Sequence, residues 1–188
     1  MASFFSGFAA LTKNEGLGLL LINTFVIIVF TFFNRDKQRV KHLLFFFLIA
    51  ILVISPWLIF SLHIPKTHEN YLAQLTATNL LGNLNRVPNI ARGFLKLMLN
   101  PRVWNITWIL LLGMIILQMK TMVKPPTVYL LALFVLQLLM YGAIYVVAPW
   151  EINWLIKCSL NRLLIHAAPL AVFLVSNQVA EFKILSWI

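Results

Sequence analysis

The chain has 188 residues, of which 61% are hydrophobic and only 11% are charged, and its mean hydropathy is +0.90. These values exclude an ordinary soluble domain, in which apolar residues make up about half of the sequence. Lys and Arg number 15 against 5 Asp and Glu. In a membrane protein this excess reflects basic segments near anionic membrane lipids, so we expect no nucleic-acid partner. The single cysteine, Cys158, excludes an intramolecular disulfide, and the four scattered histidines predict no metal site.

Apolar segments predict an all-α integral membrane protein with about five transmembrane helices, because a crossing needs about 20 apolar residues. The predicted spans are residues 17–33, 43–63, 104–118, 127–147 and 163–176. The N-terminal segment "MASFFSGFAALT" stays apolar for only about ten residues, too few to cross at about 1.5 Å per residue. We expect a helix stub there, and the whole chain, residues 1–188, to form one membrane-embedded unit.

Basic residues predict the sidedness of the chain. The segment "NRDKQRVKH" at 34–42 holds the densest basic cluster, and the positive-inside rule places it in the cytoplasm. Alternation then places residues 13–16, 64–103 and 148–162 outside, and "MKTMVKPP" and the C-terminal tail inside. We expect the bacterial inner membrane as the location.

The long outer loop contains "NRVPNIARGFLKLMLNPRVW", in which Pro88 suits a first helical turn and Pro101 a stop. Between them one face is polar (Asn89, Arg92, Lys96, Asn100) and another is apolar (Ile90, Phe94, Leu97, Met98). This pattern predicts an interfacial amphipathic helix. Two interpretations are open: the basic face is solvated beside lipid phosphates, or Arg92 and Lys96 help to hold a lipid-linked phosphate substrate.

Near the N-terminus, "LTKNEGLG" places Lys13 and Glu15 between two apolar segments, and Gly16 and Gly18 permit a turn. The two charged residues either anchor the chain at the membrane interface or serve a substrate. In the second interpretation Lys13 binds a phosphate, and Glu15 orients a hydroxyl or a divalent cation.

Near the C-terminus, Ser159, Arg162 and His166 recur at helical spacing and share one face. Trp150 and Trp154 predict that this face lies near the outer interface, as part of an aromatic belt. There the guanidinium of Arg162 could bind a phosphate, and His166 could add a hydrogen-bond donor. The alternative is that Arg162 extends to water and His166 bonds a neighbouring helix.

Two stretches, "GFAALTKNEGLGLLL" (7–21) and "SLNRLLIHAAPLAVFL" (159–174), resemble the later transmembrane part of GT-C-type membrane glycosyltransferases. The branch is that of protein O-mannosyltransferases and lipid A aminoarabinose transferases. The resemblance implies sugar transfer from a polyprenyl phosphate carrier at the outer face of a many-helix bundle.

In that resemblance Lys13 and Glu15 occupy a Lys-x-Glu-Gly turn, and Arg162 matches the Arg of a Ser-Leu-Asp-Arg-like motif, from which Asn161 departs. The acidic residue of the family's first outer loop has no counterpart, so catalytic residues are not assigned. We expect the C-terminal portion of a longer enzyme, inactive without an upstream catalytic half. The alternative is a non-enzymatic transporter segment or assembly subunit that binds anionic membrane lipids.

Overall fold

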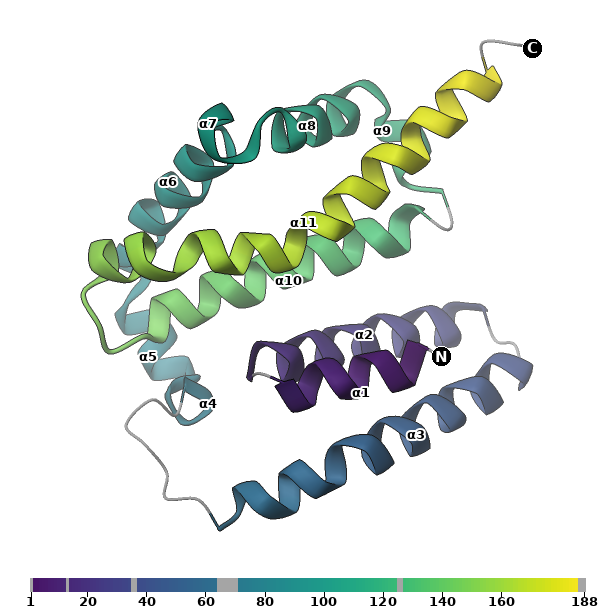
Figure 1. Cartoon of the computed structure of the whole chain (residues 1–188), viewed down its shortest axis with the longest axis vertical. Helices are drawn as coiled ribbons and strands as arrows, with labels where there is room; N and C mark the ends of the chain where they lie inside the picture. The colour runs from purple at the N-terminus through teal and green to yellow at the C-terminus, as the bar shows by residue number, and fades with distance from the viewer. Residues whose placement is uncertain (1, 13, 35–36, 64–70, 125–126, 186–188) are drawn as a thin grey trace. The chain divides into compact units, whose positions relative to one another are not determined.

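The computed structural model describes residues 2–12, 14–34, 37–63, 71–124 and 127–185. These residues are almost entirely helical and include no β-strand (Figure 1). Within these described ranges, four helices are long and apolar enough to cross a membrane, over Gly16–Phe33, Gln38–Ser61, Thr127–Val147 and Ile152–Ala180. The protein is therefore an all-α integral membrane protein, as the sequence predicts. The chain divides into two compact units, Met1–Glu69 (unit 1) and Asn70–Ile188 (unit 2).

Unit 1 consists of α1 (Ala2–Thr12), α2 (Asn14–Asn34) and α3 (Lys37–Ser61). The predicted stub is α1, a helix of 11 residues that packs against both longer helices. One of its polar side chains, Ser6, has a partner in α2, since the amide of Asn23 donates to its hydroxyl at 3.2 Å. The outer surfaces of α2 and α3 are apolar and suited to lipid, with exposed side chains that include Leu21, Phe25, Phe32, Leu44, Leu48 and Leu52.

Unit 1 differs from the sequence prediction in two places. Gly16 and Gly18 lie inside α2 instead of forming a turn. A Cβ atom on Gly16 would overlap the backbone of Ala9, so this glycine allows α1 and α2 to approach closely. The basic segment predicted as a loop over 34–42 is helical from Lys37 onward and forms the first turns of α3.

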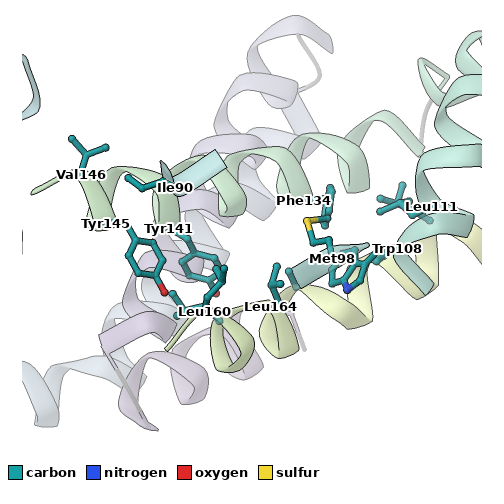
Figure 2. Packing of buried hydrophobic residues seen from close by; sticks show 14 of the residues in the cluster. Ile90, Met98, Trp108, Leu111, Phe134, Tyr141, Tyr145, Val146, Leu160 and Leu164 are labelled. Atoms are coloured by element: carbon teal, nitrogen blue, oxygen red, sulfur yellow. The ribbon is translucent and has the colours of Figure 1, made fainter. Parts of the chain in front are cut away.

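Unit 2 begins with α4 (Tyr71–Gln74), α5 (Ala77–Gly82) and the 3-10 helix η1 (Leu84–Arg86). The helices α6 (Val87–Met98), α7 (Pro101–Trp104), α8 (Thr107–Leu117) and α9 (Met119–Met122) follow. Two long helices, α10 (Thr127–Val147) and α11 (Ile152–Leu185), complete the unit. Their buried apolar side chains form one core with those of α6 and α8 (Figure 2).

α10 and α11 pack antiparallel in one constant register. The hydroxyl groups of Tyr145 and Ser159 are 2.7 Å apart near one end, and the amide of Asn177 donates to the hydroxyl of Thr127 at 2.6 Å near the other. The two residue numbers of each pair have the same sum, so the register persists past Pro169, which lies within α11. With 21 residues, α10 is about 31 Å long, which matches a hydrocarbon core of about 30 Å.

The chain from α6 to α9 runs along α10 and along much of α11 (Figure 1). Phe94 of α6 contacts Tyr145 near the end of α10, with ring centroids 6.1 Å apart. Trp108 of α8 stacks on Phe134 further back along α10, with centroids 5.9 Å apart. Figure 2 shows Ile90 beside Tyr145 in one part of the core and Trp108 beside Phe134 in another. The hydroxyl of Thr121 in α9 then donates to Gln178 near the end of α11.

Two predicted spans differ from the helices observed. The span predicted at 104–118 is interrupted, because α7 ends at Trp104 and α8 has only 11 residues. Asn105 between them has a φ of 48°, a left-handed value that stops a helix. The span predicted at 163–176 is too short, because α11 begins at Ile152. The predicted outer loop 148–162 is therefore wrong from residue 152 onward, and Cys158 is an exposed residue of a helix.

Candidate functional site

The predicted amphipathic helix is confirmed as α6, which has a Pro in its first turn. Ile90 and Met98 are buried in the core of unit 2, whereas Arg92 and Lys96 are exposed. The two cations stand four residues apart and so lie on one face of the helix. The sequence pattern thus identified both the helix and its basic face.

Two contacts define the level of α6 along the helix pair. Phe94 meets Tyr145, which lies about 3 Å from the last residue of α10 at 1.5 Å per residue. A Cβ atom on Gly93 would be 3.0 Å from the side chain of Ile156, so α6 and α11 are in close contact there. If α10 crosses the membrane from end to end, Arg92 and Lys96 therefore lie at the level of the lipid headgroups.

The register of α10 and α11 also defines the level of the predicted C-terminal site. Arg162 pairs in register with Gly142, about 7 Å from the last residue of α10, and His166 pairs with Leu138, about 13 Å from it. Arg162 is exposed and His166 is half-buried. Arg162 is therefore close enough for its long side chain to reach the headgroups, while His166 lies deeper.

Ser159, the third residue of the predicted face, has a different role. Its hydroxyl pairs with that of Tyr145 at 2.7 Å and also donates to the carbonyl oxygen of Leu155 at 2.8 Å. The first of these bonds joins α11 to α10, whereas the second lies within α11. Ser159 therefore stabilises the helix pair beside Arg162.

Arg86 was not singled out in the sequence, yet it makes a bond between segments far apart in the chain. Its guanidinium donates to the carbonyl oxygen of Ala148 at 2.6 Å, and Ala148 is only 1% exposed. Ala148 follows the last residue of α10, where carbonyl groups lack helical partners and the helix dipole favours a cation. Arg86 therefore holds the start of α6 against the end of α10.

The connection from α10 to α11 carries aromatic and acidic side chains. Trp150 and Trp154 are both exposed, with ring centroids 6.0 Å apart, as in the aromatic belts of membrane proteins. The carboxylate of Glu151 accepts backbone N–H bonds from Asn153 at 3.0 Å and Trp154 at 2.7 Å. Hydrogen bonds from Asn153 and then Trp154 lower the pKa of Glu151 below its usual 4.5, and Lys157 adds a smaller effect. Glu151 thus caps the start of α11.

Together these residues form what we call the basic end of unit 2. It comprises the exposed cations of α6 and α11, with Arg86 bonded behind them and the two tryptophans alongside; the exposed cations are Arg92, Lys96, Lys157 and Arg162. Glu151 is the one acidic residue whose side chain the structure describes, and it caps a helix. The basic end therefore has a strong positive charge and suits a phosphate group near the membrane surface.

The structure does not test the N-terminal candidates. Lys13 lies outside the described residues, and Glu15 belongs to α2 of unit 1 but its side chain is not described. Their predicted roles, including the divalent cation at Glu15, stay predictions. Among the described residues, no three His, Cys, Asp or Glu side chains gather in a way that could hold a metal ion.

At the opposite end of unit 2, polar side chains that the sequence pattern did not predict join three helices. The hydroxyl of Thr121 donates to the side-chain oxygen of Gln178 at 2.6 Å, and the amides of Asn177 and Gln178 donate to Thr127. Thr127 and Gln178 are fully buried. Such bonds between helices are stabilising in an apolar environment. Asn177 and Gln178 are neighbours in the sequence and show no helical period, so the sequence pattern could not predict this cluster.

Comparison of the chain with protein-family models, with curated proteins and with solved structures finds no match.

Proposed function

We propose that the basic end of unit 2 binds the phosphate of a polyprenyl-phosphate-linked sugar, and that the chain is the donor-binding portion of a membrane glycosyltransferase. The main support for the proposal is that the exposed cations lie at about the same level along the axis of α10. Arg92, Lys96 and Arg162 come from two helices and lie within about 8 Å of the end of α10 along its axis. A polyprenyl phosphate in the membrane holds its charge at this level.

The chemistry of the side chains supports the same ligand. A guanidinium can form two parallel hydrogen bonds with a phosphate, and lysine adds a compact charge. The reason for proposing that this phosphate carries a sugar is the resemblance of residues 7–21 and 159–174 to membrane glycosyltransferases. In this proposal the catalytic carboxylate and the acceptor belong to a further segment or subunit. The proposal keeps the five predicted crossings, with which the basic end would lie outside the cytoplasm.

One observation favours a second function, the binding of anionic membrane lipid by a non-enzymatic transporter segment or assembly subunit. The carboxylate of Glu151 already accepts two backbone N–H bonds, so it is poorly suited to act as a catalytic base. A lipid-binding subunit needs no base. The two functions differ in ligand selectivity, since only the first requires preference for a polyprenyl phosphate over anionic phospholipids.

Binding of a polyprenyl phosphate to the purified protein in neutral-lipid nanodiscs tests the proposal through Arg162. Arg162→Ala should lower the affinity more than tenfold, and Arg162→Lys should lower it less, because lysine keeps the charge but loses the two-point contact. Tenfold corresponds to about 1.4 kcal/mol. Arg102→Ala, at an exposed Arg of α7, is the matched control and should change little.

Unchanged affinity in both Arg162 variants would remove this residue from the site. Equal affinity of the parent protein for a polyprenyl phosphate and for the uncharged polyprenol would contradict phosphate recognition altogether. Equal affinity for phosphatidylglycerol and for a polyprenyl phosphate would support the second function instead.

A further inference from the structure

The segment from α6 to α9 covers the thickness of a membrane although it contains no long helix. Gly93 meets Ile156 and Thr121 meets Gln178, and these two points on α11 are about 33 Å apart at 1.5 Å per residue. Along α10 the same segment passes from Tyr145 to Phe134. A stretch that accompanies a membrane-spanning pair over this distance has its two ends on opposite sides of the bilayer.

This segment is interrupted near its middle. α7 ends at Trp104, Asn105 takes a left-handed φ of 48°, and α8 starts after Ile106 without a capping side chain. The break is close to Trp108, which stacks on Phe134. Phe134 lies about 10 Å from the first residue of α10 and about 20 Å from the last, at 1.5 Å per residue. The break is therefore well inside the bilayer.

The break is also at the surface of unit 2. Ile106 is 58% exposed and Asn105 is exposed, and each lies at a point where helical backbone bonding is interrupted. Non-helical backbone at this depth does not face lipid, because hydrocarbon offers no hydrogen bonds to peptide groups; it faces protein or water. Beside it, the indole N–H groups of Trp104 and Trp108 are buried and meet no acceptor within the described part of the chain.

We infer that residues 93–122 form a discontinuous membrane crossing, and that its break at Asn105 and Ile106 lines a water-filled opening in the bilayer. Water there satisfies the peptide groups of the break. The opening admits small hydrophilic solutes to the middle of the crossing. The inference rests on the depth and exposure of the break and does not require phosphate binding at the basic end.

Cysteine labelling with a membrane-impermeant sulfonated maleimide tests the opening, in the full chain with Cys158→Ser as the background. Ile106→Cys should react at least tenfold faster than Leu139→Cys in intact membranes. Leu139 is a matched control because it is 62% exposed and lies in the middle of α10 without a break. Equal labelling after denaturation in SDS confirms that both thiols are present.

Labelling of Ile106→Cys as slow as that of Leu139→Cys, from both faces of the membrane, would overturn the opening and mean that protein or lipid covers the break. If Ile106→Cys does not fold, the labelling rate of Asn105→Cys is compared with that of Leu139→Cys instead. The crossing itself is tested by Val87→Cys and Met119→Cys, both at exposed positions. They should be labelled from opposite faces, and labelling from one face would overturn the crossing.

Discussion

Arg162 shows how an ionisable residue is accommodated in an apolar helix of this protein. A charge at the centre of a bilayer is costly in free energy. Arg162 avoids the centre, because it pairs in register with Gly142 and so lies about 7 Å from the end of α10. An arginine side chain can reach the headgroups over that distance while its methylene groups stay in lipid. His166 lies deeper and is half-buried, so it contributes to packing of α11 more than to the charge of the basic end.

Glu151 makes the start of α11 sensitive to acid. Because backbone N–H bonds lower its pKa below 4.5, the cap stabilises the folded protein above that pH and is lost as the pH falls through the lower, folded-state value. Glu151→Ala should therefore lower the thermal unfolding temperature in detergent at pH 7. The difference from the parent should shrink as the pH falls below about 4.5.

Glu151→Asp is the control for this effect, since aspartate is a preferred capping residue and should keep most of the stability at pH 7. A difference between the parent and Glu151→Ala that stays constant from pH 7 to pH 3 would show that the carboxylate does not act through its charge.

At the scale of the elements, α6 could be predicted and the break after it could not. Pro88, Arg92 and Lys96 follow the helical period closely enough to define both the helix and its exposed face. The break depends on a left-handed Asn105 in an otherwise apolar run. Asparagine takes a positive φ more often than most residues but does not require it, so the sequence predicts a continuous helix there.

The start of α11 was missed for a physical reason. Lys157 and Arg162 indicate a loop when helices are predicted from apolar runs alone. In the structure, residues 152–156 extend beyond the level at which α10 ends, so this part of α11 needs no apolar surface. The cap by Glu151 and the bond from Arg86 to Ala148 fix this region. Both depend on contacts that a single sequence does not display.

The contact between α1 and α2 depends on one glycine. Gly16→Ala should destabilise the protein by roughly 1 to 3 kcal/mol, because the added methyl group would overlap the backbone of Ala9. Gly113→Ala in α8 is the matched control, since its added methyl group would meet no neighbouring side chain or helix within 4 Å. It should be neutral or stabilising by up to about 1 kcal/mol. Thermal unfolding in detergent measures both, and equal stability of the two variants would contradict the close approach of α1 and α2.

At the scale of the whole molecule, unit 2 has cations at both ends but a concentrated basic surface at one. Arg92, Lys96 and Arg162 join the aromatic pair at the end where α10 stops, whereas Lys120 and Lys124 stand near the start of α10. The predicted sidedness places the first group outside and the second in the cytoplasm. The same change in net charge can therefore be made at either end, by replacing Arg92 and Lys96 or by replacing Lys120 and Lys124 with glutamate.

The most direct test of phosphate recognition at the basic end compares these two pairs in neutral-lipid nanodiscs at low salt. Each basic residue near an anionic surface contributes about 1 kcal/mol, so Arg92→Glu with Lys96→Glu should weaken polyprenyl phosphate binding more than tenfold. Lys120→Glu with Lys124→Glu makes the same change in net charge at the other end and should leave binding within about twofold of the parent. An equal loss in both double variants, or no loss in the first, would contradict a phosphate site at the basic end.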